Sequence, residues 1–258
     1  MIFDSHMHVG DFPLFDVSLD REGLEALMAE HGIGAGVVFH PDNAYVREVI
    51  ESTPGVYGLV WANPRVPGYL DEAAELLEHP RFLGVKLHPL LDGYHPNDPA
   101  VHPLMRLLVE RDLPVLIHCG HPIFTLPWSI EELIASFPEA RVVLGHMGHG
   151  NVVYINGAID VAARHPRVYL ETSGMPMHTK IREAVERVGP DRVLYGSDVP
   201  FHHPSVEILK VRVSGLAPDL VDRVLGTNGY ALFLGAEKRD DAVGADPSKE
   251  VSASRSSQ

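Results

Sequence analysis

Histidine is the residue type that stands out in this sequence. The 258 residues include 16 histidines, against 21 lysines and arginines together. Several histidines share one kind of position, because each ends a short apolar run: His6 and His8 in the first run, His118 in the fifth and His146 in the sixth. The eighth run ends in a carboxylate, Asp198. Imidazole nitrogens with one carboxylate, and without a cluster of thiolates, are typical ligands of Zn²⁺, with Mn²⁺ and Fe²⁺ as alternatives.

The spacing of His6 and His8 suits a metal ion. Side chains two residues apart on a β-strand project to the same face, about 7 Å apart. A histidine-rich sequence also produces this spacing by chance, so the pair alone decides nothing. Because the ends of three other runs supply His118, His146 and Asp198 as further donors, we predict a divalent-metal site.

Eight apolar runs carry or flank these residues. They begin near Ile2, Ala35, Val56, Leu83, Pro114, Arg141, Arg167 and Arg192. The intervals contain apolar residues at the three and four spacing of amphipathic helices, as in 70–78, 130–136, 155–164 and 181–188. Strands that alternate with helices at this length predict βαβ units and a parallel sheet. No Gly-x-Gly-x-x-Gly follows the first run, which argues against a dinucleotide-binding sheet.

Eight such units within residues 1–235 predict a single α/β domain of the (β/α)₈ TIM-barrel type. The carboxyl ends of barrel strands meet at one mouth, so we expect the polar residues at the run ends to converge there. Residues 236–258 contain no aromatic side chain and few large aliphatic ones, and we expect them to form a disordered tail.

Composition limits the partners and the compartment. The formal net charge of −14 repels a phosphate backbone, and no basic cluster offsets it, so we expect a small-molecule substrate rather than nucleic acid or an anionic membrane. The single cysteine, Cys119, allows no intramolecular disulfide and is expected in the core. There is no apolar run of about 18 residues and no signal peptide, which favours a cytoplasmic protein. Pairing of helix faces into a homodimer is compatible with this fold.

The histidine motifs resemble a known family. The first run contains His-x-His, and Val-Leu-Ile-His118-Cys-Gly, Leu-Gly-His146-Met-Gly and Gly-Ser-Asp198-Val-Pro follow. As a set, these motifs resemble the amidohydrolase superfamily and its amidohydrolase-related branch, which includes aminocarboxymuconate-semialdehyde decarboxylase. The resemblance covers residues 1 to about 235. It implies that His6, His8 and Asp198 hold one metal ion. It also implies that His118 is a ligand and that His146 is a ligand or a catalytic residue.

Lys86 bears on the number of metal ions. Strand alternation turns Lys86 and His88 to the barrel mouth together. Lys86-Leu-His88-Pro is similar to the fourth-strand motif of dihydroorotases, whose lysine is carboxylated and bridges two metal ions. By this resemblance we favour Lys86 as a carboxylated metal ligand and two ions rather than one. The alternative is an ammonium group paired with a substrate carboxylate, with Glu171 or with Asp198.

These observations lead us to expect a metal-dependent hydrolase. A metal-activated water would attack the carbonyl carbon of an amide, lactone, ester or thioester. Asp198 would accept the proton of this water and pass it to the leaving group. His146 would complete a second metal site or stabilise the oxyanion. The expected substrate-binding residues are His88, Ser173, His121 and Trp128.

Four other functions compete with hydrolysis. A one-metal decarboxylase of the same branch ranks second, because the chain is short for that group and shows no arginine cluster for an acidic substrate. A metal-dependent deoxyribonuclease would have a glutamate in place of Lys86 and a basic surface. A metal-storage barrel leaves many polar strand ends unused, at a cost in stability. A Schiff-base aldolase built on Lys86 leaves the histidines and Asp198 unexplained.

Overall fold

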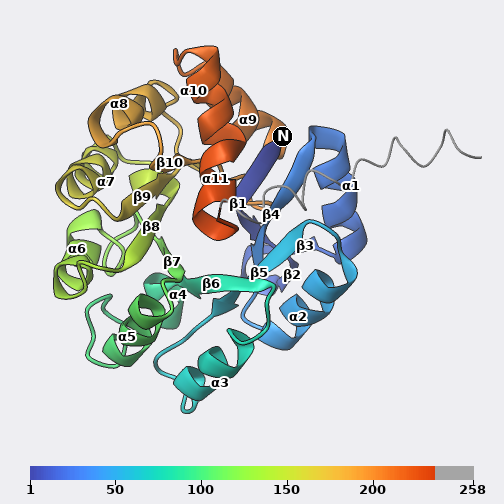
Figure 1. Cartoon of the computed structure of the whole chain (residues 1–258), viewed down its shortest axis with the longest axis vertical. Coiled ribbons are helices and arrows are strands. Elements are labelled where there is room, and N and C mark those ends of the chain that lie inside the picture. The colour runs from blue at the N-terminus through green and yellow to red at the C-terminus, as the bar shows by residue number, and fades with distance from the viewer. Residues whose placement is uncertain (236–258) are drawn as a thin grey trace, which may run out of the picture.

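The computed structural model describes residues 1–235, and the tail predicted to be disordered, 236–258, lies outside the described residues. Eight parallel strands form one sheet in chain order, surrounded by helices, which confirms the TIM barrel (Figure 1). The strands are β1 (Ile2–His8), β4 (Ile33–Phe39), β5 (Val56–Trp61), β6 (Phe82–Leu87), β7 (Pro114–His118), β8 (Arg141–Gly145), β9 (Val168–Glu171) and β10 (Val193–Leu194).

The barrel closes between its first and last strands. The N–H of Ser5 donates to the carbonyl of Tyr195 at 3.0 Å, and the N–H of His8 donates to the carbonyl of Val199 at 2.7 Å. Between them, the N–H of Asp198 donates to the carbonyl of His6 at 2.7 Å. The closing hydrogen bonds therefore run through the segment that ends in Asp198, and they join it directly to His6.

Helices follow the strands, as the periodicity predicts. They are α1 (Arg21–His31), α2 (Asn43–Ser52), α3 (Tyr69–Leu76), α4 (Pro89–Asp92), α5 (His102–Glu110), α6 (Pro127–Ser136), α7 (Val152–Arg164), α8 (Thr179–Val188), α9 (Pro204–Arg212), α10 (Pro218–Asp222) and α11 (Asn228–Phe233). Local sequence determines where α2 begins. The Asp42 carboxylate accepts hydrogen bonds from the N–H groups of Ala44 and Tyr45 and so caps the N-terminus of this helix. The periodicity of the sequence does not predict α9, α10 and α11.

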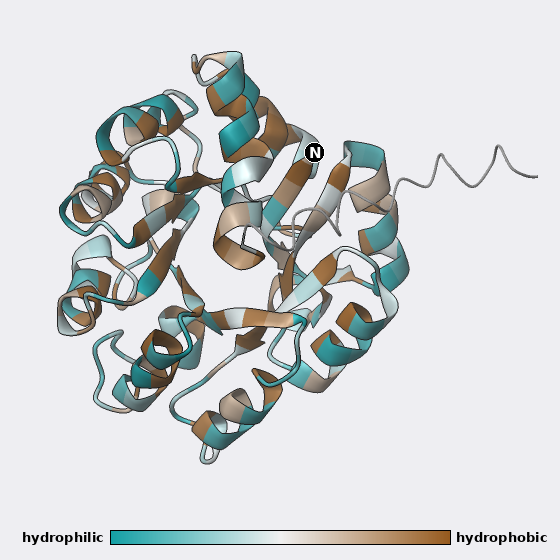
Figure 2. Cartoon of the chain, viewed as in Figure 1, coloured by the Kyte–Doolittle hydropathy of each residue, from teal (hydrophilic) through white to brown (hydrophobic). Residues whose placement is uncertain are grey.

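Two apolar layers hold the barrel together. Inside it, Phe3, Leu59 and Leu116 belong to a buried cluster that extends to Phe233 of α11. Outside it, the other face of the strands packs against the helices, and Cys119 is buried in this larger cluster, as expected. Figure 2 shows hydrophobic residues along the strands, whereas most helices carry both hydrophobic and hydrophilic residues. The strands are therefore covered on both faces, as parallel sheets require.

A short hairpin follows β1 directly and was not predicted. It consists of β2 (Gly10–Phe12) and β3 (Val17–Leu19), which pair antiparallel around a turn at Pro13–Phe15. The turn ends at Asp16, whose φ of 54° lies in the left-handed region. Because the hairpin begins two residues after His8, it lies at the end of the barrel where the polar strand ends converge. None of the helices within residues 1–235 combines the length and hydropathy needed to cross a bilayer.

Candidate metal site

His6 is fixed by a buried carboxylate. Its Nδ1 atom lies 2.7 Å from Oε2 of Glu171, at the end of β9, and both side chains are fully buried. Glu171 also accepts hydrogen bonds from the N–H groups of His146 (3.1 Å) and Ser173 (2.5 Å). Since a carboxylate only accepts, Nδ1 of His6 carries the proton, and Nε2 presents its lone pair on the opposite side of the ring.

That lone pair faces the carboxylate of Asp198, which also approaches His8. Oδ1 of Asp198 lies 3.4 Å from Nε2 of His6 and 3.1 Å from Nε2 of His8. Burial lowers the pKa of both imidazoles, which favours their neutral forms. Two imidazole nitrogens and one carboxylate oxygen converging in this way suit a divalent cation, and the donor set therefore fits one.

The position of Asp198 depends on its backbone. Its φ of 58° is left-handed, and its N–H is held by the carbonyl of His6 at 2.7 Å. Burial raises the pKa of the Asp198 carboxyl from 3.8 to about 8, and the charge of Lys86 opposes this shift. A nearby divalent cation favours the ionised carboxylate in the same way as Lys86, because both carry positive charge.

A second group of ligand atoms consists of His6, His146 and Glu171. Here the two oxygens of Glu171 already contact four hydrogen-bonding groups: Nδ1 of His6, the N–H of His146, and the N–H and hydroxyl of Ser173. These hydrogen bonds account for the clustering without a metal ion. We therefore regard Glu171 as the group that orients His6 rather than as a metal ligand.

Lys86 lies beside the three converging donors. Its Nζ atom is 3.4 Å from Nε2 of His6 and 4.6 Å from the centroid of the Phe39 ring, and the side chain is fully buried. Burial lowers the pKa of this ammonium group to about 7, and the charges of Asp198 and Glu171 act in the opposite direction. The structure thus brings Lys86 to the predicted site.

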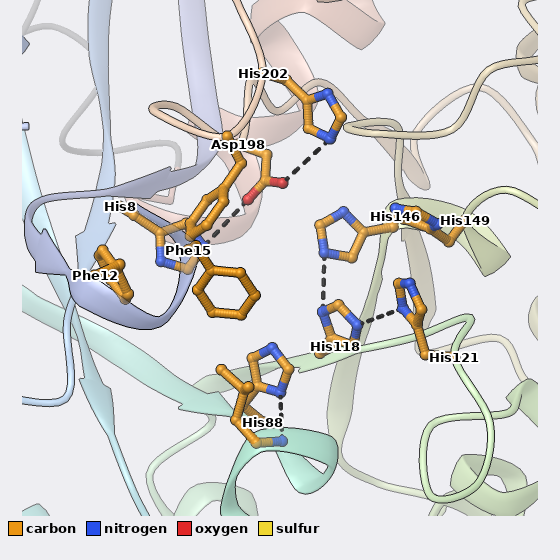
Figure 3. A pocket seen from close by; sticks show the side chains of 12 residues that line it. His8, Phe12, Phe15, His88, His118, His121, His146, His149, Asp198 and His202 are labelled. Atoms are coloured by element: carbon orange, nitrogen blue, oxygen red, sulfur yellow. Dashed lines mark hydrogen bonds and ion pairs between the residues drawn. The ribbon is translucent and has the colours of Figure 1, made fainter. Parts of the chain in front are cut away.

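His146 and His118 are hydrogen-bonded to each other. Nε2 of His146 lies 3.0 Å from Nδ1 of His118, whose Nε2 lies 2.8 Å from Nδ1 of His121 (Figure 3). The His118 ring also stacks on His88 at 4.1 Å between centroids, and His88 stacks on Trp61 at 5.6 Å. Both ring nitrogens of His118 are therefore engaged, and the structure does not bring this predicted ligand into the group of His6, His8 and Asp198.

A cavity of about 190 Å³ opens beside these residues. It is lined by His8, Phe12, Phe15, His88, Leu91, His118, His121, His146, His149, Asp198, Phe201 and His202. Imidazoles form one side of it and phenyl rings another (Figure 3). Sequence reasoning had not assigned the apolar side to the site, because its residues come from the hairpin, α4 and the loop after β10. No local pattern distinguishes them from packing residues.

Two predicted substrate-binding residues lie outside the cavity lining. The hydroxyl of Ser173 is fully buried beneath the cavity and hydrogen-bonds with Nδ1 of His146 at 3.0 Å. Trp128 packs against Gly157 on α7 and contacts the ring of Tyr154 at 6.2 Å. In the structure, Ser173 supports His146 from below and Trp128 packs on a helix.

Comparison with known proteins agrees with the fold and the motifs. A family model described as Amidohydrolase matches residues 4–234. No curated protein matches the sequence at a significant level. The identities to the solved structures given below lie at 16–17%, so these similarities establish the shared fold.

Three similar structures have named activities. A dihydroxybenzoic acid decarboxylase from Polaromonas, solved with bound manganese and the inhibitor 2-nitroresorcinol, is 16% identical with a TM-score of 0.75, covering 94% of this chain and 99% of that one. The 5-carboxyvanillate decarboxylase of Sphingomonas paucimobilis is 17% identical with a TM-score of 0.70 (90% and 98% covered). A probable 2-pyrone-4,6-dicarboxylic acid hydrolase of Acinetobacter baumannii is 17% identical with a TM-score of 0.69 (90% and 98% covered).

Proposed function

This chain belongs to the amidohydrolase family, and on this premise we propose that it is a decarboxylase of small aromatic acids that uses one divalent metal ion. Hydrolysis was the first expectation from the sequence, with decarboxylation as the alternative. Two observations support the alternative: named decarboxylases are prominent among the similar structures, and His6, His8 and Asp198 form a donor set that suits a single ion.

The observation that carries the proposal is the approach of three donor atoms. Nε2 of His6 and Nε2 of His8 lie 3.4 and 3.1 Å from Oδ1 of Asp198. These residues would hold the metal ion, and Glu171 would keep the lone pair of His6 directed at it. When bound, a divalent cation acts as a Lewis acid that withdraws electron density from substrate oxygen atoms. Manganese is the first choice, because a similar structure holds it, and zinc is the second.

One metal ion accounts for the geometry better than two. A second ion would need donors such as His118 and His146, which instead hydrogen-bond to each other at 3.0 Å. Glu171 is occupied by its own hydrogen-bond donors. Lys86 then acts as a buried ammonium group that balances the negative charge of Asp198 and Glu171.

The proposed reaction breaks the bond between a ring carbon and its carboxylate. The electron pair of this bond stays on the ring carbon, carbon dioxide leaves, and the ring carbon takes up one proton. We assign Asp198 to deliver this proton, because its carboxyl lines the cavity. The carboxylate takes up a proton from solvent, passes it to the ring carbon and is ionised again afterwards. On the imidazole side, His146 and His118 form a fixed hydrogen-bonded pair that orients the substrate.

A second candidate rests on Lys86. Its Nζ atom lies 3.4 Å from Nε2 of His6, so a carboxylated Lys86 would place its carbamate beside the same donor. This supports the alternative of a two-metal hydrolase that cleaves amides, lactones or esters.

Elemental analysis distinguishes the two candidates. The wild type and Lys86→Ala are purified in parallel after growth with manganese and zinc, with Lys180→Ala on α8 as a control lysine. We expect one metal ion per chain in all three proteins, and release of carbon dioxide from 2,6-dihydroxybenzoate by the metal-loaded wild type. Two ions in the wild type that fall to one or none in Lys86→Ala alone would overturn the decarboxylase proposal and favour the hydrolase.

A further inference from the structure

We propose that the cavity accepts a single flat ring with one carboxylate and rejects rings that carry a second carboxylate. This inference rests on the proposed function, because it takes the substrate to be an aromatic acid. It concerns the parts of the cavity away from His6, His8 and Asp198, and it follows from the size, the walls and the charges of the cavity.

The volume sets the size of the ligand. A dry cavity of about 150 Å³ binds one benzene molecule in a well-studied engineered case. The cavity here measures about 190 Å³, so it holds one ring with a few small substituents. A fused or two-ring substrate would extend beyond its walls.

The walls favour a planar molecule. On the apolar side, Phe201 packs edge to face with Phe12 at 5.4 Å and with Phe15 at 5.3 Å between ring centroids. On the imidazole side, the rings of His88 and His121 are within 17° and 20° of parallel to His118. A flat ring between these two sides gains contact with aromatic surfaces on both faces, an arrangement that aromatic pairs favour.

The charged side chains around the cavity disfavour the binding of a second carboxylate. Within residues 1–235, no lysine or arginine lines the cavity. Lys86 lies below it, against His6 and Phe39. Lys210 is turned away and donates to the carbonyls of Thr172 (3.2 Å) and Met175 (2.7 Å).

The imidazoles do not replace the missing cation. His118 uses both ring nitrogens in hydrogen bonds to His146 and His121, and Nδ1 of His88 accepts a hydrogen bond from the N–H of Leu91. His8 and His202 both face the carboxylate of Asp198, at 3.1 Å and 3.7 Å. A second carboxylate bound among these groups and the phenyl rings would lose its water without gaining a positive partner, which is costly.

Three ligands of matched shape test the charge argument. They are 2,6-dihydroxybenzoate, its 3-nitro derivative, and 2,4-dihydroxyisophthalate, which carries a second carboxylate where the nitro derivative carries a neutral group of the same shape. Binding to the manganese-loaded protein is measured by calorimetry. We expect the first two to bind with similar affinity and the dicarboxylate to bind roughly tenfold or more weakly.

A gain-of-function variant makes the test sharper. Leu91 lines the cavity from α4 and is 41% exposed, so a longer polar side chain fits there without disturbing the core. Leu91→Arg supplies the missing cation and should reduce the discrimination against the dicarboxylate at least about fivefold. Leu91→Gln adds a polar side chain without charge and should leave the discrimination unchanged.

The outcomes separate this inference from the proposed function. Equal binding of the nitro derivative and the dicarboxylate by the wild type would overturn the inference, whatever is found for carbon dioxide release. So would a failure of all three ligands to bind. If the preference is found but 2,6-dihydroxybenzoate releases no carbon dioxide, the specificity of the cavity stands and the proposed decarboxylation falls.

Discussion

The backbone N–H of Asp198 donates a hydrogen bond of 2.7 Å to the carbonyl of His6, and the side chains of the same two residues converge at 3.4 Å. The contact joins the last strand region to the first, so it closes the barrel and assembles the candidate metal site in one step. Formation of the site is therefore coupled to closure of the fold. A ligand that binds the two side chains should stabilise the barrel as a whole.

Metal removal should lower the thermal stability of the protein. A ligand present at about one hundred times its Kd stabilises the folded state by about 2.7 kcal/mol. For a chain of this size, this corresponds to a rise in Tm of about 5 to 10 °C. We expect this shift on adding manganese to chelator-treated protein, measured by calorimetry, and no shift in Asp198→Ala. A shift of the same size in the variant would show that the ion binds elsewhere.

Glu171→Gln should weaken metal binding while the fold persists. The glutamine keeps the shape of the side chain but no longer provides a carboxylate for the proton on Nδ1 of His6, 2.7 Å away. Loss of such an outer partner typically reduces metal affinity by roughly ten- to a hundredfold. A competition titration with a metal-binding dye measures the affinity. The exposed Glu139→Gln is the control, and unchanged affinity in Glu171→Gln would contradict the orienting role.

Gly196→Ala should distort the candidate metal site through steric overlap. A Cβ atom at this position would lie 2.7 Å from Cβ of His6 and would also contact Oε1 of Glu171. Because both neighbours are buried, we expect a loss of roughly 1 to 3 kcal/mol in the free energy of unfolding, together with weaker manganese binding. Guanidinium unfolding measures the first effect. Gly150→Ala, which has open space around its Cβ, should behave like the wild type.

The buried pair of Glu207 and Lys210 should make stability depend on pH. Burial raises the pKa of the Glu207 carboxyl from 4.5 to about 7, and Lys210 opposes the shift. Because the folded-state pKa lies above the unfolded one, the stabilising contribution of this proton is present below pH 4.5 and is lost as the pH rises toward 7.

The comparison with Glu207→Gln isolates this contribution. We expect the stability of the wild type relative to the variant to fall between about pH 5 and pH 8, measured by chemical unfolding at several pH values. Parallel stability profiles for the two proteins would show that Glu207 does not titrate in this range.

The barrel was predictable because its signals are local. Strands and helices differ in the period of their apolar residues, and the eight runs recur at the lengths of βαβ units. The hairpin of β2 and β3 was missed because its strands have three residues each, too few to show a period. The helices after β10 were not assigned because the repeat of strand and helix ends with the eighth strand.

The sequence by itself determined which polar residues lie at the mouth, since in a parallel barrel the end of every strand reaches the same rim. His6, His8 and Asp198 were identified in this way, and so was the position of Lys86. Tertiary structure alone decided how these groups pair. The bonds of His118 to His146 and of His6 to Glu171, and the aromatic wall, join residues from separate strands and loops. Such pairings depend on the rotamers and backbone angles of segments distant in the chain, which no local periodicity encodes.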